Sequence, residues 1–215
     1  YMQGVYQWAY LDPHNARLLD KDFIVSTILL GNNRRLKRAL LAEVGPGSTA
    51  LQAAHVYGGL IPELARHIGH AGRLDVIDVV PLQAELCRQK LADLPQAEVF
   101  LADAAEFSGR QYDLVSCFFL LHELPDMTKH AVVDNLLSCL AEGGRAVFID
   151  YHRPVNWHPL RPVMRMIYNL FEPFAASMWK NDICTFACDP GLYDWEKRTY
   201  FGGIYQKVVV TRRRP

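Results

Sequence analysis

The 215-residue sequence lacks a charge excess, a long apolar run and a paired-cysteine motif. Its 23 Lys and Arg residues balance 23 Asp and Glu residues, whereas a protein dedicated to nucleic acid normally carries a basic excess. The longest apolar runs, 24–30 and 114–121, are far shorter than the ~18 residues of a membrane span. Half of the residues are hydrophobic, which excludes intrinsic disorder. We therefore expect one globular domain that does not bind nucleic acid.

Cysteine is scarce, and none of it forms a C-x-x-C pair. The odd count of five argues against a disulfide framework or a zinc ribbon, and favours a reducing, cytoplasmic compartment. The sequence begins at Tyr1 without the charged and apolar regions of a signal peptide. Because the first residue is not Met, it remains open whether an N-terminal extension is missing.

Short apolar segments alternate with helical patterns after Gly45. Strands are expected at 48–54, 73–78, 97–101, 112–119 and 145–150, and helices at 60–68, 81–91, 126–140 and 159–179. Gly143-Gly144 is expected to form a turn, and residues 200–210 two short strands or a hairpin. This alternation predicts an α/β fold, with a mostly parallel sheet flanked by helices and an antiparallel hairpin at its C-terminal end.

Polar residues and a glycine follow the first three predicted strands. In a parallel sheet the ligand binds beyond the carboxyl ends of the strands. Asp78 ends the second strand, where a carboxylate suits the two hydroxyls of a ribose. Asp103 follows the third strand, and Gly58 closes the loop after the first. Over residues 48–150 this spacing resembles the class I S-adenosylmethionine-dependent methyltransferases.

The resemblance implies a Rossmann-like sheet of seven strands, with residues 1–44 as a helical segment capping the cleft and residues 45–215 as the S-adenosylmethionine-binding catalytic domain. It also implies a set of cofactor-binding positions. These are Gln52, Tyr57, Gly58, Asp78, Val79, Asp103, Ala104 and Phe118.

The first loop departs from that family. The family usually has an acid followed by G-x-G-x-G, but here Gln52 replaces the acid and only Gly58 of the glycines remains. One interpretation is a degenerate copy of the fold that no longer catalyses. The other is an unusual use of the cofactor, since an ammonium without a carboxylate partner loses its proton more easily and becomes a nucleophile.

Four further stretches narrow the resemblance. Residues 56–58, 118–125, 150–162 and 198–207 together resemble the rhodoquinone biosynthesis proteins (RquA type), over nearly the whole chain. That family converts ubiquinone to rhodoquinone by exchanging a ring methoxy group for an amino group. The resemblance implies S-adenosylmethionine as co-substrate and amino donor, and a requirement for Mn²⁺. A conventional methyltransferase acting on a quinone or another small molecule, and a non-catalytic binding module, are the alternatives.

Side chains able to move protons follow strands one, four and five, which this fold places side by side. The catalytic candidates are Tyr57, His122, Tyr151 and His152. Imidazole and carboxylate together suit manganese, so the candidate ligands are His122, Glu123, Asp150 and His152. A histidine near the start of a helix is also often a cap or a satisfied core residue.

Two segments carry the features of a membrane-surface contact. The predicted 159–179 helix has an apolar stripe and a proline that is expected to kink it, and Arg34–Arg38 is strongly basic. The stripe is Leu160, Val163, Met164, Ile167, Leu170, Phe171, Phe174 and Met178, and the kink is at Pro173. Such a stripe also commonly packs on the protein core. With ubiquinone as substrate, we expect peripheral association with the inner, or mitochondrial inner, membrane.

Overall fold

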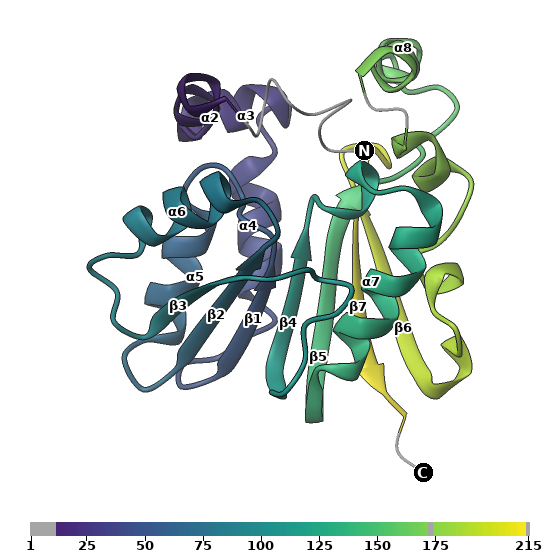
Figure 1. Cartoon of the computed structure of the whole chain (residues 1–215). Helices are drawn as coiled ribbons and strands as arrows, with labels where there is room; N and C mark the ends of the chain where they lie inside the picture. The colour runs from purple at the N-terminus through teal and green to yellow at the C-terminus, as the bar shows by residue number, and fades with distance from the viewer. Residues whose placement is uncertain (1–11, 172–173, 214–215) are drawn as a thin grey trace.

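A seven-stranded sheet organises the protein (Figure 1). The computed structural model describes residues 12–171 and 174–213. The strands are β1 (Thr49–Ala53), β2 (Arg73–Asp78), β3 (Ala97–Leu101), β4 (Tyr112–Phe118), β5 (Leu140–Tyr151), β6 (Tyr193–Tyr200) and β7 (Tyr205–Arg212). Their order is β3-β2-β1-β4-β5-β7-β6, with β1 to β5 parallel and β7 antiparallel to both β5 and β6. The predicted α/β sheet with a C-terminal hairpin is confirmed.

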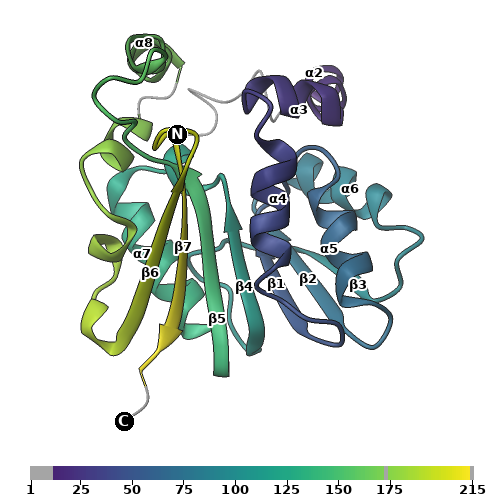
Figure 2. The ribbon, with the colours of Figure 1, turned by 180° about the vertical axis from the view of Figure 1, so that it is seen from behind.

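Helices cover both faces of this sheet. The α-helices are α2 (Pro13–Leu19), α3 (Asp22–Ile28), α4 (Asn33–Leu41), α5 (Leu60–Ile68), α6 (Pro81–Lys90), α7 (Asp126–Ser138) and α8 (Arg161–Phe171). Short 3₁₀ turns are η2 (Leu121–Glu123), η3 (Ala175–Trp179), η4 (Ile183–Phe186) and η5 (Pro190–Leu192). Helix α7 lies in front of the sheet in Figure 1, and α4 lies in front when the molecule is turned in Figure 2.

Each face has its own core. One core joins Leu36 and Leu40 of α4 to the apolar side of α5, so the described part of the N-terminal segment packs directly on the sheet domain. The other core places Val133 and Leu137 of α7 against Phe186 of η4. Because both faces of the sheet are covered, the central strands β1, β2 and β4 are buried at nearly every position rather than at alternate ones.

Three predicted elements differ from the structure. Strand β5 has twelve residues and runs through Gly143-Gly144, which is not a separate turn. A Cβ at Gly144 would lie 2.6 Å from the carbonyl oxygen of Tyr112, so the strand needs glycine there to approach β4. The predicted 159–179 helix is divided into α8 and η3, and the kink proposed at Pro173 lies outside the described residues. The hairpin is longer than predicted, since β6 and β7 together span 193–212.

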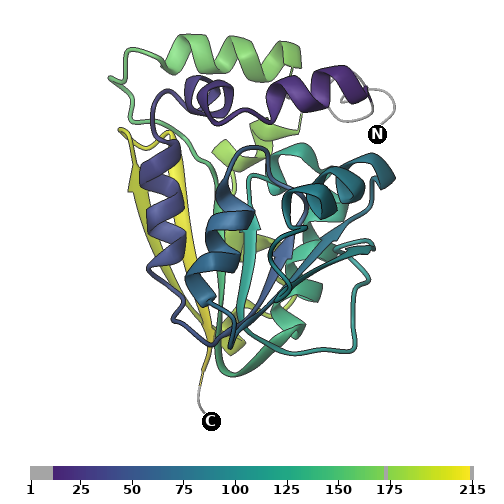
Figure 3. The same ribbon diagram turned by 90° about the vertical axis from the view of Figure 1, so that its left-hand side faces the viewer.

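Helices α2, α3 and α8 lie beyond the carboxyl ends of the parallel strands (Figure 3). The segment before α8 is held by the Val155 amide, which donates to the Gly202 carbonyl at 2.9 Å. On the other side of α8, the fully buried Lys129 of α7 donates to the Phe174 carbonyl at 2.9 Å and contacts the Ser177 hydroxyl. None of the described helices is both long and apolar enough to cross a membrane.

Candidate active site

The loop after β1 has two residues with positive φ, although only one of them is a glycine. Ala54 has φ +65° and Gly58 has φ +81°. A positive φ costs an alanine of the order of 1–2 kcal/mol relative to glycine. Ala54 stands at the first glycine position of the motif and adopts the left-handed conformation that glycine favours.

Gln52 is enclosed within the sheet. Its side chain is fully buried, and its Oε1 accepts a hydrogen bond of 2.7 Å from Ser116 on the paired strand β4. Its Nε2 donates to the carbonyls of Ala53 at 2.8 Å and Ala54 at 3.2 Å. An acid could not make those two donations, because a carboxylate offers only acceptors. Gln52 therefore stabilises the end of β1 and the strained residue that follows it.

Asp78 ends β2 in a buried position. Its two carboxylate oxygens accept hydrogen bonds of 2.8 Å from the amides of His55 and Val80. Burial raises the pKa of the carboxyl to about 6, against the lowering effect of those two amides. Each oxygen keeps a lone pair, so the carboxylate can still accept from two ribose hydroxyls. This position fits the predicted cofactor role.

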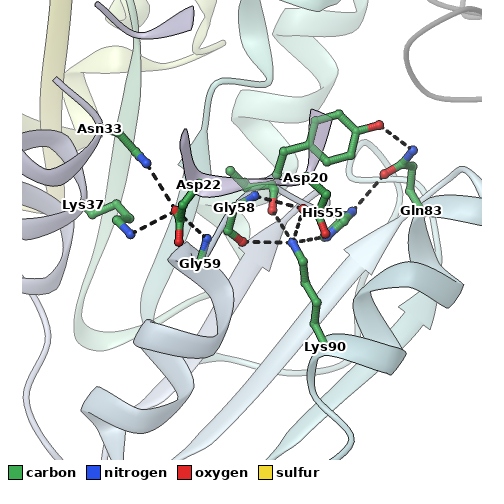
Figure 4. A network of polar contacts seen from close by, with 11 residues as sticks. Asp20, Asp22, Asn33, Lys37, His55, Gly58, Gly59, Gln83 and Lys90 are labelled. Atoms are coloured by element: carbon green, nitrogen blue, oxygen red, sulfur yellow. Dashed lines mark hydrogen bonds and ion pairs between the residues drawn. The ribbon is translucent and has the colours of Figure 1, made fainter. Parts of the chain in front are cut away.

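A directed chain of hydrogen bonds connects Lys90 to Tyr57 (Figure 4). Lys90 Nζ lies 3.0 Å from His55 Nε2, and His55 Nδ1 lies 2.9 Å from Gln83 Oε1. Gln83 Nε2 in turn donates to the Tyr57 hydroxyl at 3.0 Å. Burial, and to a lesser degree Lys90, lowers the pKa of His55 to about 3. His55 is therefore neutral: its Nε2 accepts a hydrogen bond from Lys90, and its Nδ1 donates one to the Gln83 side-chain oxygen.

Tyr57 stays protonated in this setting. Burial raises the pKa of its phenol, and the carboxylates of Asp20, Glu123 and Asp78 raise it further, against the hydrogen bond from Gln83. A phenol held in this form acts as a hydrogen-bond donor rather than as a base. Tyr57 can thus orient a ligand at the cleft, but is not suited to remove a proton from it.

Two aspartates of the N-terminal segment cap the same loop. Asp20 accepts from the Gly58 amide at 2.9 Å and pairs with Lys90, and Asp22 accepts from the Gly59 amide at 3.1 Å. Both amides lie at the N-terminus of α5, where backbone N–H groups favour negative charge. The N-terminal segment is therefore joined to the cofactor loop by charged hydrogen bonds (Figure 4).

His122 and Asp150 form a buried pair at the ends of β4 and β5. His122 Nδ1 lies 2.9 Å from Asp150 Oδ1, and the His122 amide donates to Asp150 Oδ2 at 3.3 Å. Glu123 Oε1 is 3.9 Å from His122 Nε2. With Nδ1 directed at the carboxylate, Nε2 becomes the acceptor, which is the arrangement of an oriented general base.

Aromatic rings surround this pair. The rings of Phe119 and Tyr151 lie 5.9 Å and 4.8 Å from the His122 ring, and 5.2 Å from each other. Tyr205 packs behind them, 5.7 Å from Tyr151, and its fully buried hydroxyl has no hydrogen-bond partner among the described residues. Such a surface binds flat rings by edge and face contacts.

The remaining predicted residues are spread around the cleft. Val79 is 52% exposed just after Asp78, while Asp103 is exposed and accepts from the Ala105 amide at 2.8 Å. Ala104 is half-buried beside it. Phe118 is buried in the core, and the ring at the cleft is that of its neighbour Phe119, which has φ +53°.

His152 is not brought to His122. Its Nδ1 lies 3.0 Å from the Gly203 carbonyl oxygen, and its side chain lines a different cavity of about 830 Å³ with Trp157, Asp182 and Lys197. Within residues 12–171 and 174–213, no three His, Cys, Asp or Glu side chains are grouped in a way that could hold a metal ion. The four candidate manganese ligands therefore do not form a common site.

Several residues of the site carry no motif in the sequence. Asp20, Gln83 and Lys90 act only through the three-dimensional network around His55, and no local pattern predicts it. Asp150 was a candidate metal ligand, but its oxygens accept from His122 and from the Tyr151 amide instead. The sequence did place Asp150 at the end of a strand beside the His122 turn, and this position could have indicated the contact between them.

Comparisons with known proteins agree with this geometry. Residues 50–144 match the family model described as a methyltransferase domain. An uncharacterised methyltransferase of Synechocystis is 26% identical over 207 residues, which is 94% of this chain and 92% of that protein. The ubiquinone/menaquinone biosynthesis C-methyltransferase UbiE of Pseudomonas putida is 26% identical over 171 residues, 74% of this chain and 64% of that protein.

A solved structure shows the same fold. That of the mitomycin 7-O-methyltransferase MmcR matches with a TM-score of 0.72 at 16% identity, over 97% of this chain and 60% of that one. Strands β1 to β4, the loop after β1 and the acid ending β2 all fall within or next to the matched family region. The chain therefore has the class I methyltransferase fold, and its residues 50–144 match a methyltransferase domain.

Proposed function

We propose that this protein is an S-adenosylmethionine-dependent transferase whose acceptor is a quinone or a similarly flat, oxygen-substituted ring. The observation that carries the proposal is the buried His122–Asp150 pair with Phe119 and Tyr151 around it. His122 follows β4, the neighbour of β1, and Asp150 lies on β5, the next strand along. The loop after β1 would form the cofactor side. The similarity to a ubiquinone/menaquinone biosynthesis enzyme supports a quinone-type ring.

The cofactor side would be formed by Asp78, the 54–59 loop and Asp103. Asp78 would accept from the ribose hydroxyls, and Asp103 would face the adenine edge, as the family resemblance implies. S-adenosylmethionine supplies an electron-poor methyl group on sulfur. The protonated Tyr57 would donate a hydrogen bond toward the bound molecules, while Gln83 holds its hydroxyl in place.

The acceptor side would prepare the ring for attack. Phe119 and Tyr151 would bind the faces and edges of the ring. His122 Nε2 removes a proton from the acceptor, and Asp150 stabilises the imidazolium that forms. The acceptor then becomes electron-rich, which is what methyl transfer requires.

Amino transfer, as in rhodoquinone biosynthesis, is the second candidate, and Gln52 is the observation that favours it. The residue that usually carries the acid is neutral and fully enclosed, so the first loop offers no carboxylate at that position to the cofactor's ammonium. A neutral amine would add to the ring carbon that carries methoxy. His122 would take the amine's proton and return it as methanol leaves, which gives an adduct whose nitrogen joins the ring to Cα of the cofactor. Release of the aminoquinone would then need an elimination across the cofactor's Cα–Cβ bond: the N–Cα bond breaks with its electron pair going to nitrogen, the Cβ proton is transferred to nitrogen, and the methionine portion leaves as the alkene. Among the described residues, no three His, Cys, Asp or Glu side chains are placed to hold manganese for this reaction.

Product analysis separates the two reactions. The protein is incubated with a short-tail ubiquinone, or with its demethylated form, and S-adenosylmethionine carrying heavy carbon in the methyl group and heavy nitrogen in the amino group. Methyl transfer places the heavy carbon in the product and releases S-adenosylhomocysteine. Amino transfer places the heavy nitrogen in the product and releases methanol.

The proposal requires turnover that depends on His122. We expect His122→Ala to abolish labelled product while cofactor binding persists. Binding of S-adenosylmethionine without product, across quinones and with or without added manganese, would contradict the proposal and indicate a non-catalytic binding module.

A further inference from the structure

Exposed apolar side chains gather in two parts of the chain. Twelve large hydrophobic side chains are exposed in the described structure, and eight of them lie within 18–30 and 155–166. We call these eight the distal apolar surface. They are Leu18, Phe23, Ile28, Leu30, Val155, Trp157, Val163 and Met166. The side chains of Phe23 and Trp157 are 81% and 80% exposed, so they do not pack in the protein core.

The two parts lie at the same end of the molecule. Helix α3 and helix α8 both stand beyond the carboxyl ends of the parallel strands (Figures 1 and 3). Within α8, Met164 is buried while Val163 and Met166 point outward. The predicted apolar stripe thus does not face the core as a whole. Positions 167, 170 and 171 of that stripe lie outside the described side chains.

The same parts of the chain are basic. Residues 12–38 hold six Lys and Arg against three Asp, and residues 153–166 hold three Arg and no acid, although the whole chain is neutral. Arg34, Arg38 and Arg165 are exposed. Two of the three aspartates are already engaged, Asp20 with Lys90 and Asp22 with Lys37. The positive charge therefore remains available around the apolar side chains.

We propose that the distal apolar surface docks on an anionic lipid bilayer. Exposed aromatic and aliphatic side chains flanked by arginine are the features that bind membrane interfaces, through apolar burial plus attraction to anionic headgroups. A second copy of this chain is a poorer occupant, because a two-fold contact would bring the same basic residues face to face. Docking would turn the cleft end of the sheet toward the bilayer.

Vesicle binding tests this surface without reference to the reaction. The protein is mixed with vesicles of phosphatidylcholine alone or with about a third phosphatidylglycerol, and bound protein is measured by flotation. We expect binding to the anionic vesicles that weakens with salt, and a blue shift of Trp fluorescence that Trp157→Phe reduces. The variant Phe23→Ser/Trp157→Ser/Met166→Ser should lower the partition coefficient about tenfold or more.

A matched control lies at the opposite end of the molecule. Leu192 is 55% exposed in η5, before the start of β6, and Leu192→Ser should leave binding unchanged. The charge variant Arg34→Gln/Arg165→Gln should lower binding to anionic vesicles by several-fold while leaving thermal stability unchanged. Absence of binding to either vesicle would overturn the proposal. So would binding that the triple variant retains, or a protein dimer that the triple variant dissociates.

Discussion

The two halves of the candidate active site differ in their chemistry. The cofactor half, at the ends of β1 and β2, is a dense polar network in which Lys90, His55 and Asp78 hold the loop by hydrogen bonds. The acceptor half, at the ends of β4 and β5, is mainly aromatic, with one histidine–aspartate pair inside it. A ligand with fixed polar groups suits the first half, and a flat ring of variable substitution suits the second.

This difference indicates that ligand binding and proton transfer depend on different residues. In the cofactor half almost every polar group has a partner already, so a change there alters binding or folding before it alters a proton transfer. In the acceptor half only His122 is oriented for proton transfer, while the rings around it provide contact area. Substitutions should therefore separate binding from turnover according to the half in which they fall.

The largest effect is expected for His122→Ala. Loss of a positioned general base lowers kcat by about 10²–10⁴-fold, while the dissociation constant for S-adenosylmethionine should change less than about twofold. Steady-state kinetics and calorimetry measure the two. His130→Ala is a matched control, since that ring, on α7, contacts the Phe186 carbonyl of η4, away from the pair. If His122→Ala weakened S-adenosylmethionine binding as strongly as it lowered kcat, the two halves would not act separately.

The next effect concerns Asp78 and pH. Asp78→Asn should weaken cofactor binding about ten- to a hundredfold, as expected for hydrogen bonds to a charged acceptor, with little change in kcat at saturation. Because the pKa of Asp78 is about 6, the carboxyl is protonated and a poorer acceptor below that value. Wild-type affinity should therefore rise as pH increases from 5 to 7. A binding profile in Asp78→Asn as steep as that of the wild type would contradict this assignment.

Gln52→Glu tests whether the cofactor half tolerates the usual acid. The new carboxylate would face the carbonyl oxygens of Ala53 and Ala54, which Gln52 now contacts as a donor. We expect the free energy of unfolding to fall by about 2–3 kcal/mol at pH 7, with partial recovery at low pH where the acid is protonated. Denaturant unfolding measures this. Unchanged stability would mean that the loop can rearrange around an acid.

The smallest effect is expected for Ala54→Gly. Glycine relieves the positive φ but makes the unfolded chain more flexible, so the free energy of unfolding should rise by only about 0.5–1 kcal/mol. Phe119→Gly is not an equivalent test, because it also removes a ring from the acceptor half. A fall in stability in Ala54→Gly would show that the methyl group contributes packing that outweighs its strain.

Much of the fold was predictable because its signals are local. Alternating apolar segments indicated the parallel strands, and Asp78 and Asp103 could be placed from their spacing to strand ends. The His122 turn and Tyr151 were expected together, and their rings do meet at 4.8 Å. These predictions rest on one rule, that parallel strands bring their carboxyl ends to one edge.

The remainder depends on side-chain direction and on distant segments. His152 follows Tyr151 immediately but contacts Gly203 instead, since adjacent residues of extended backbone point apart. Lys90 meets Asp20 across seventy positions of sequence, which no periodicity encodes. The helix predicted for 159–179 had continuous apolar spacing, yet residues 175–179 form the 3₁₀ helix η3, because a hydrophobic pattern alone does not distinguish an α-helix from a tighter turn.

Helix α8 is held at both of its approaches, by the Val155–Gly202 hydrogen bond and by the buried Lys129. A helix restrained on both sides gives the protein a fixed tilt relative to whatever it rests on. Binding to a bilayer would confine the search for the acceptor to two dimensions, and the fixed tilt would keep the site in one orientation during that search. Turnover would then follow the mole fraction of acceptor among the lipids, and diluting the vesicles at constant composition would leave the rate of the bound enzyme unchanged.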